Sequence, residues 1–408
     1  MSTHRRQFLK SATLVGVAAP FIVASHQVCG AAANEKVRVA VVGCGGRGRM
    51  ITGLFAKDGN YEIVSVADYH QTVADGCGKQ FGVLPERCFS GLSGYKKSLA
   101  TNIDAIVLEA VPYFFPEHIR ASVEAKKHVY VAKPIAVDIW GTQAVQALAA
   151  QSQKDGKVFL IDFQIPTEAN NQKVLSGVRN GDVGKILSLQ TCYHAGYFGD
   201  PAFKSYEERL QRLNWVNDDI LGGGYHVNAC IHGIEAGLEL VDAEMPVSAL
   251  GSSCCSRPDP HGDSHNMYSL TFDFEDGRIW SHQGMHHQTP FWVRAVGYGV
   301  DGNAEIGYTG NAKMRVAERN DGRVTWRNED FGEIAKDLYP AGASYNIAKF
   351  ARAILSGDTT NDTVKIGVNA NFVTILGREA GKRRSKVLLA DLIRENHRYE
   401  LDTTGWKE

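Results

Sequence analysis

Residues 37–48, Val-Arg-Val-Ala-Val-Val-Gly-Cys-Gly-Gly-Arg-Gly, decide the fold. The first half is a β-branched apolar run, which is typical of a buried parallel strand. It leads directly into a GxGxxG motif and a candidate helix over residues 47–57. In this motif the glycines permit a tight turn, close approach of a pyrophosphate and close helix packing, and the helix N-terminus attracts phosphate. The predicted dinucleotide-binding loop consists of Gly43, Gly45, Gly46, Arg47 and Gly48.

A carboxylate follows at the spacing that this motif requires. A second predicted strand, residues 62–67, ends at Asp68, which is 20 residues beyond Gly48. A carboxylate there accepts hydrogen bonds from ribose hydroxyls, and no arginine directly follows it to bind a 2′-phosphate. We therefore expect NAD as the cofactor, while Arg47 and Arg49 leave NADP open.

The alternation of elements predicts two domains. Strands over 104–108 and 128–131 flank a helix over 116–126, which is typical of βαβ units and a parallel sheet. Further along, the apolar runs Met267–Phe274 and Arg278–Gln283 are joined by Glu-Asp-Gly, which indicates an antiparallel hairpin. We predict an α/β chain in which a Rossmann domain with a doubly wound parallel sheet (34–155) precedes an α+β domain with a mostly antiparallel open sheet (156–408).

The first residues have the pattern of an export signal. The pair Arg5-Arg6 precedes an apolar, uncharged stretch over residues 12–24, and alanines follow at 31–33. This arrangement is typical of a twin-arginine signal. A membrane anchor or a buried helix is the alternative, but the stretch is shorter than the roughly 20 residues that a span needs. We expect residues 1–33 to direct export to the periplasm by the twin-arginine machinery, leaving no membrane span after processing.

The overall charge excludes one class of partner. The 408 residues include 44 basic and 45 acidic side chains, and the expected processing removes three basic residues, which changes the formal net charge from −1 to −4. With no long basic run, the chain has no electrostatic footprint for nucleic acid. Seven cysteines would remain, an odd number without a CxxC pair, which argues against a disulfide scaffold or a zinc ribbon.

Two later motifs resemble those of a known family. Ala132-Lys133-Pro134 follows the predicted strand 128–131, and residues 222–235 read Gly-Gly-Gly-Tyr-His-Val-Asn-Ala-Cys-Ile-His-Gly-Ile-Glu. Together with the glycine loop, their order resembles the glucose-fructose oxidoreductase, inositol dehydrogenase and MocA family (Gfo/Idh/MocA). The resemblance implies NAD(P)-dependent oxidation of a sugar or polyol hydroxyl, and a homo-oligomer.

The resemblance also implies roles for individual residues. Lys133 and His232 would face the substrate beside the nicotinamide, and Pro112, His118 and Pro134 would contact the cofactor together with Lys133. Imidazole has an unperturbed pKa near neutrality, so His232 is our candidate general base or acid. Lys133 is its candidate electrostatic partner.

The sequence departs from the family pattern at three positions. Ala132 stands where the family has glutamate, and Asn228 and Glu235 stand where it has aspartates. Asn228, His232 and Glu235 are spaced i, i+4 and i+7, which puts them on one helix face. That face presents polar groups either to a cleft or merely to solvent. We include Asn228 and Glu235 with Lys133 and His232 as candidate catalytic residues.

Other polar residues are candidates for recognising the substrate. Hydroxyl recognition and ring stacking suit polar and aromatic groups, and our candidates are Gln164, His194, His226 and Trp280. Residues 195–221 lack a clear period, and we expect a long loop or short helices near the mouth of the site.

Several histidines superficially have the spacing of metal ligands. No carboxylate-bearing helix or CxxC accompanies them, so we expect no bound metal. They are His261, His265, His282, His286 and His287.

Three functions fit the sequence. Because the twin-arginine route moves folded proteins, we expect a cofactor that is loaded before export, tightly held and recycled in place. The first function is an oxidoreductase for a carbohydrate or polyol. The second is a glycosidase, lyase or epimerase that oxidises its sugar transiently. The third is a sugar-binding protein with a degenerate active site, which the loss of two family carboxylates would explain.

Overall fold

The computed structural model describes residues 36–197, 205–210, 212–256, 262–287 and 289–408. The expected export signal and His261 lie outside the described residues. Among the described helices, none is both long and apolar enough to cross a membrane. None of the seven cysteines that the structure describes forms a disulfide bond with another described cysteine.

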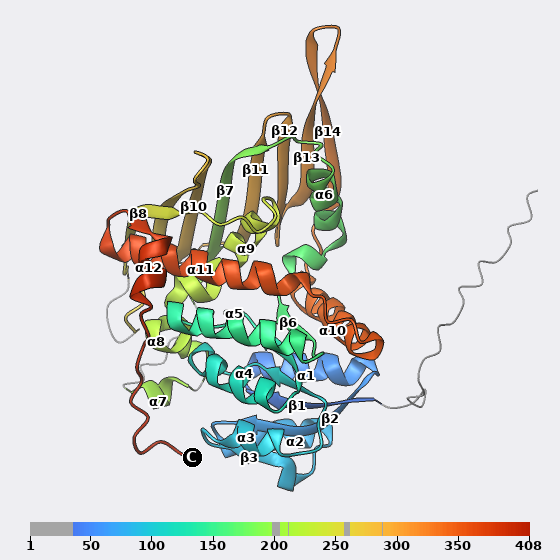
Figure 1. Ribbon diagram of the computed structural model, residues 1–408, viewed down its shortest axis with the longest axis vertical. Coiled ribbons are helices and arrows are strands. Elements are labelled where there is room, and N and C mark those ends of the chain that lie inside the picture. Colours follow the sequence, from blue (N-terminus) through green and yellow to red (C-terminus); the bar gives the residue numbers. More distant parts are fainter. Residues whose placement is uncertain (1–35, 198–204, 211, 257–261, 288) are drawn as a thin grey trace, which may run out of the picture. The chain divides into compact units, whose positions relative to one another are not determined.

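A six-stranded sheet of order β3-β2-β1-β4-β5-β6 forms the N-terminal part of the fold (Figure 1). All of its strand pairs are parallel, which confirms the predicted Rossmann sheet. Its last strand lies beyond residue 155, where we expected the domain to end. The strands are β1 (Val37–Val42), β2 (Tyr61–Asp68), β3 (Cys88–Ser90), β4 (Ala105–Leu108), β5 (His128–Ala132) and β6 (Phe159–Asp162).

Helices cover both faces of this sheet. Successive side chains of β1 point to opposite faces, so that Val39 and Val41 join one apolar cluster while Ala40 and Val42 join the other. The first cluster is covered by α1 (Gly46–Asp58), α2 (Gln71–Phe81) and α10 (Leu338–Ser356). The second is covered by α3 (Gly94–Leu99), α4 (Phe115–Glu124) and α5 (Ile139–Lys154). Because α10 comes from the C-terminal part of the chain, the two predicted domains share a core.

The second sheet has nine strands in the order β14-β13-β12-β11-β7-β10-β9-β8-β15. Among the described strands of this second sheet, only β7 and β10 pair in parallel. The sheet is therefore mostly antiparallel, as predicted. The expected hairpin is β9–β10, with Gly277 in the left-handed region at its turn. The strands are β7 (Ile186–Ala195), β8 (Ser248–Cys254), β9 (Met267–Asp273), β10 (Ile279–His286), β11 (Trp292–Gly299), β12 (Gly302–Gly307), β13 (Asn311–Asn320), β14 (Arg323–Glu333) and β15 (Val387–Leu388).

Helices pack on one face of the second sheet. Helix α9 (Ile231–Glu239) contacts β7 and β11, α11 (Asp362–Arg383) contacts β8 and β9, and α6 (Ala169–Arg179) contacts β12 to β14. Helix α11 also contacts α5, so it lies between the two sheets (Figure 1). The opposite face of the sheet carries exposed apolar side chains, among them Leu250, Ile279 and Tyr298.

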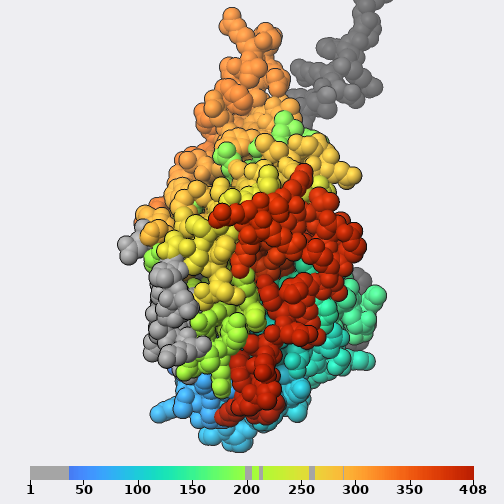
Figure 2. Space-filling model, turned by 90° about the vertical axis from the view of Figure 1, so that its left-hand side faces the viewer, coloured from blue at the N-terminus to red at the C-terminus, as the bar shows by residue number. Residues whose placement is uncertain are grey.

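The C-terminal tail returns to the Rossmann domain. After α12 (Leu389–Glu395) the chain runs down to the N-terminal sheet, as the red segment of Figure 2 shows. Lys407 accepts a hydrogen bond at its carbonyl from the amide of Leu92 (2.8 Å), and its own amide donates to the Tyr69 hydroxyl (2.9 Å). The tail is therefore held against the end of β2.

Candidate active site

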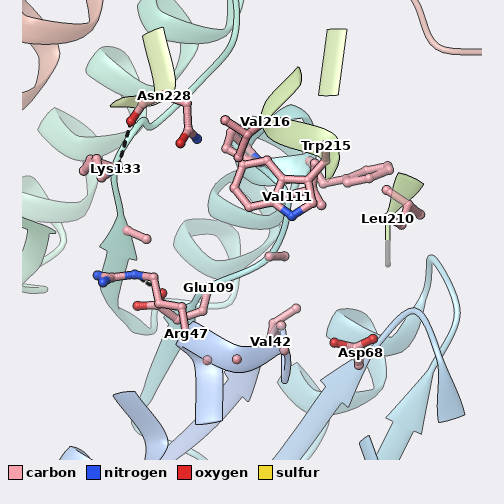
Figure 3. Close-up of a pocket in the computed structure, with 18 of the residues that line it drawn as sticks. Val42, Arg47, Asp68, Glu109, Val111, Lys133, Leu210, Trp215, Val216 and Asn228 are labelled. Atoms are coloured by element: carbon pink, nitrogen blue, oxygen red, sulfur yellow. Dashed lines mark hydrogen bonds and ion pairs between the residues drawn. The ribbon is translucent and has the colours of Figure 1, made fainter. Parts of the chain in front are cut away.

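One cavity of about 1170 Å³ lies at the carboxyl ends of the Rossmann strands (Figure 3). The strand order reverses between β1 and β4, because the chain continues from β1 to β2 on one side and from β4 to β5 on the other. Open α/β sheets bind their ligands at such a point. Pockets for single small ligands hold about 300–1,000 Å³, so this cavity has room for a dinucleotide and a further small molecule. The described residues lining it come from both parts of the fold.

The glycine loop forms one wall of the cavity. Gly43 has φ of +95°, and a Cβ on Gly48 would lie 1.8 Å from the Gly43 carbonyl oxygen, so both positions require glycine. Gly45 and Gly46 face open space within 4 Å and line the cavity together with Arg47. The loop therefore leaves a path for a pyrophosphate to approach the backbone.

Asp68 lies at the other end of this wall, at the end of β2. Its Oδ2 accepts a hydrogen bond from the Cys44 amide (2.8 Å), and its Oδ1 accepts one from the His70 amide (3.0 Å). These bonds fix a carboxylate at the cavity, in the position where a ribose would bind. The residues present therefore fit a nicotinamide dinucleotide.

An apolar surface adjoins the loop. Pro112 and His118 both line the cavity. The His118 ring stacks on Phe114 and lies 4.2 Å from the Tyr95 ring centroid. Burial lowers the pKa of His118 to about 3, so this imidazole is neutral at physiological pH. Pro134 is buried beside Lys133 and does not itself line the cavity.

Lys133, Asn228 and His232 line the opposite end of the cavity. The Lys133 ammonium donates a hydrogen bond to the backbone carbonyl of Asn228 (2.7 Å), which joins the Rossmann strand β5 to the turn before α9 (Figure 3). Burial and the nearby Arg47 lower the pKa of Lys133 to about 7. The lysine can therefore exchange a proton near neutral pH.

Gln164 acts on His232 from outside the cavity. The Gln164 side chain donates to the Asp162 carbonyl (3.2 Å), so its Oε1 is free to accept from the Tyr308 hydroxyl (2.6 Å). The Tyr308 oxygen lies 3.4 Å from His232 Nδ1 and is left to accept a hydrogen bond from an Nδ1–H group. This series of hydrogen bonds favours the tautomer in which His232 Nε2 carries a lone pair. Gln164 is thus a positioning residue, although we expected it to bind substrate.

Burial and the nearby Lys133 and Arg47 cations lower the pKa of His232 well below its usual value. The imidazole is therefore neutral, which is the form that accepts a proton. Its ring stacks against Tyr193, with 6.0 Å between the ring centroids. The packing and the hydrogen bond hold His232 in one orientation.

A buried charge cluster at the cavity was missed from the sequence. Arg47 Nε lies 2.8 Å from Glu109 Oε2, and its Nη2 lies 2.6 Å from Asp162 Oδ2. Both carboxylate side chains are fully shielded from solvent. Arg47 also donates to the Tyr339 hydroxyl, from α10. Burial raises the pKa of Glu109 to about 7, and Arg47 opposes that shift.

This cluster changes the meaning of Ala132. Glu109 directly follows β4, the strand that pairs with β5, and its charge favours the protonated form of Lys133. A carboxylate therefore acts on the lysine from the neighbouring strand, although position 132 has none.

Besides Pro134 and Gln164, four more expected site residues do not line the cavity. Trp280 packs in the core against Phe272, and Gly237 of α9 leaves room for its ring. His194 points to the other face of β7, because strand side chains alternate, and its neighbour Tyr193 lines the cavity instead. Glu235 lies almost a full turn beyond His232 and is wholly buried. His226 is buried between α11 and β10.

The described part of the segment between β7 and α9 forms the mouth of the cavity. It contains the short helices α7 (Tyr206–Arg209) and α8 (Asp219–Gly222), as expected. Leu210, Trp215 and Val216 line the cavity, and the Trp215 indole reaches into it opposite Val42 (Figure 3). An aperiodic run rich in aromatic residues was the signal for this mouth.

The comparisons with known proteins agree with this geometry. Residues 37–160 match the model of the Gfo/Idh/MocA oxidoreductase family, described as an NAD-binding Rossmann fold. These residues are therefore similar to the NAD-binding domain of that family. The glycine loop, Asp68 and Lys133 all fall within the matched residues.

Solved structures with a similar fold include two proteins that are named for sugars. A levoglucosan dehydrogenase in complex with NADH and levoglucosan has a TM-score of 0.70 at 16% identity, covering 87% of this chain and 100% of that one. The aldose-aldose oxidoreductase of Caulobacter crescentus, complexed with glycerol, has a TM-score of 0.66 at 19% identity, with the same coverage. These likenesses show a shared two-part fold.

A curated relative is similar over a shorter span. The 2,7-anhydro-N-acetylneuraminate hydratase of Escherichia coli K12 is 23% identical over 179 residues. The match covers 43% of this chain and 44% of that protein, so the chain spans less than half of the relative's length.

Proposed function

We propose that this protein oxidises a hydroxyl group of a sugar or polyol with a nicotinamide cofactor. The proposal rests on one observation: the same cavity has the glycine loop and Asp68 at one end and Lys133 and His232 at the other. When bound, NAD supplies the hydride acceptor. The levoglucosan bound to one structural relative, and the name of the other as an aldose-aldose oxidoreductase, support a carbohydrate as substrate.

The residues of the chain supply the proton chemistry. His232 Nε2, left unprotonated by the bond at Nδ1, takes the proton of the substrate hydroxyl. Lys133 holds positive charge beside the developing alkoxide and stabilises it. Asn228 positions Lys133 through its carbonyl, which any residue at 228 could supply. The family aspartate is therefore dispensable for this contact.

NAD is the cofactor that the loop favours over NADP. Asp68 lines the cavity where its carboxylate could accept hydrogen bonds from the ribose hydroxyls of NAD, and Arg47 is engaged by two buried carboxylates. Arg49 donates to the backbone carbonyls of Cys44 (3.2 Å) and Val73 (3.4 Å). Both arginines thus have partners that compete with a 2′-phosphate.

We further propose that the cofactor stays bound during export and turnover. The sequence of residues 1–33 supports export by the twin-arginine route to the periplasm. The C-terminal tail supports retention, because Tyr69 and Leu92, which line the cavity, are hydrogen-bonded to Lys407. Apolar side chains on the outer face of the second sheet support a homo-oligomer.

A second candidate is transient oxidation without net redox change, as in a glycosidase, lyase or epimerase. The similarity to a hydratase favours it, since adding water consumes no hydride. The same His232, Lys133 and recycled cofactor would serve. A sugar-binding protein without catalysis is a third candidate, and the neutral imidazole and titratable lysine at one cavity argue against it.

The test begins with the nucleotide. The full-length protein is purified, denatured, and its released nucleotide identified by mass spectrometry; we expect NAD, and an empty protein that binds NAD weakly would contradict the proposal. The protein is then incubated with deuterated sugars, and deuterium transfer to the bound cofactor is measured. Loss of transfer in His232→Ala, with retention in Cys254→Ser, is the expected pattern. Product analysis separates net oxidation from cleavage, dehydration or epimerisation.

A further inference from the structure

Two imidazoles and a thiol meet in the core outside the cavity. His226 and Cys230 lie on the π-helical turn His226–Cys230 that precedes α9, and His282 lies on β10. One ring nitrogen of each histidine and Cys230 Sγ all lie within 4.8 Å of one another. All three side chains are buried, with at most 2% of each residue exposed. π-helical turns occur often at functional sites.

Hydrogen bonds orient both imidazoles toward this cluster. His226 Nδ1 lies 2.9 Å from the Thr374 carbonyl oxygen, which can only accept, so Nδ1 carries the proton and Nε2 the lone pair. His282 Nδ1 lies 2.8 Å from the Thr191 hydroxyl, which is itself fixed by Trp280 Nε1 (2.7 Å). Both Nε2 atoms are buried and have no hydrogen-bond partner among the described residues. Metal-binding histidines are usually oriented in this way through their second nitrogen.

Two glycines make room for the cluster. A Cβ on Gly377 would lie 2.7 Å from His226 Cε1, and a Cβ on Gly284 would lie 2.7 Å from Cys230 Sγ. Larger residues at either position would displace the side chains that converge there. Burial lowers the pKa of both histidines, which keeps them in the neutral form that binds metals.

The donor set selects the ion. A thiolate is a soft ligand that suits Cu(I) or zinc, imidazole binds both metals as well, and no carboxylate takes part. Structural zinc sites have four ligands, whereas this cluster has three. Loss of the thiol proton on binding Cu(I) leaves a site with no net charge, whereas Zn²⁺ would leave a buried positive charge. The Arg378 cation, whose charge acts on His226, makes that charge still less favourable.

We propose that His226, Cys230 and His282 form a three-coordinate site for Cu(I). On binding, the Cys230 thiol releases one proton and its sulfur bonds to the ion, with no change in oxidation state. The site joins the π-helical turn to β10. It would therefore hold in place the turn that carries Asn228 and leads to His232.

The experiment measures copper in the full-length protein. The chain is produced in copper-supplemented medium in a Cys254→Ser, Cys255→Ser background, because these adjacent exposed thiols are a second place where Cu(I) could bind. We expect about one copper per chain, with about one sulfur and two nitrogen neighbours by X-ray absorption. Adding Cys230→Ser or His282→Gln should remove it, and Thr191→Val should weaken binding by about 10–100-fold.

Circular dichroism shows whether each variant is folded, and only folded variants are compared. Refolding with excess Cu(I) or Zn²⁺ provides a second measurement, because an ion that binds the folded state raises the melting temperature. We expect Cu(I) to raise it in the background protein and not in the Cys230→Ser protein. A protein that takes up no copper, prefers zinc, or retains its copper without Cys230 would overturn the assignment.

Discussion

Replacing Arg47 with methionine tests the buried charge cluster at the cavity. The guanidinium contacts Glu109 at 2.8 Å and Asp162 at 2.6 Å, and both carboxylates are shielded from solvent. Removing one partner of a buried ion pair costs about 3–5 kcal/mol, because each remaining partner must either stay charged without compensation or take up a proton. We expect Arg47→Met to lose stability within that range at pH 8.

The loss should shrink in acid. The pKa of Glu109 is about 7, raised from 4.5, so the folded state holds this proton longer than the unfolded state and stability falls as pH rises between those values. At pH 8, one unit above its pKa, the carboxyl of Glu109 is ionised in the folded wild-type protein. This ionisation stabilises the folded state by about 1.4 kcal/mol relative to a carboxyl that stays protonated. Without Arg47 the carboxyl stays protonated at pH 8, and this contribution disappears. At pH 5 it is protonated in both folded proteins.

Urea unfolding of nucleotide-free protein at pH 5 and pH 8 measures both effects. The matched control is Arg38→Met, because Arg38 pairs with Asp104 at 2.7 Å while their side chains are 34% and 36% exposed. An exposed pair is worth about 0–1 kcal/mol. Equal losses of unfolding free energy in the two variants would refute the reasoning. So would a loss in Arg47→Met that is not at least about 1 kcal/mol larger at pH 8 than at pH 5.

Three further changes have distinct outcomes. Trp280→Ala should cost about 3–5 kcal/mol in urea unfolding, because it empties a core position, while NAD binding by the folded protein is kept. Deleting residues 402–408 removes both hydrogen bonds of Lys407, and NAD release measured by fluorescence should speed up about tenfold. The lowered pKa of Lys133 makes stability rise with pH between 7 and 10.5, since the unfolded chain binds more protons; chemical denaturation of Lys133→Met should lack that rise.

Local patterns carry much of the fold. The strand, glycine loop and helix over residues 37–58 occupy adjacent positions, and two of the loop glycines are required locally, Gly43 by its dihedral angle and Gly48 by its contact with the Gly43 carbonyl. Alternation likewise predicts the β9–β10 hairpin. The direction of a strand side chain is harder to predict, because a shift by one residue exchanges the two faces of the sheet. For this reason we expected His194 at the site, whereas Tyr193 lines the cavity.

Sites formed by tertiary contact escape such patterns. Tyr308, which follows β12, reaches His232 on helix α9, and Asp162 meets Arg47 although 115 residues separate them. Nothing in the local sequence around these residues distinguishes them from ordinary core positions. The His226, Cys230 and His282 cluster is of the same kind, because two of its members lie on one turn and the third on a strand.

The absence of glutamate at position 132 shows how a motif can mislead. Within the motif, Ala132 indicates that Lys133 has lost its carboxylate. In the sheet, however, the carboxyl ends of β4 and β5 lie side by side, so the residue that follows β4 reaches the same edge. Glu109 is that residue, and its charge acts on Lys133. A missing motif residue in a parallel sheet should therefore be sought at the end of the neighbouring strand before an active site is judged degenerate.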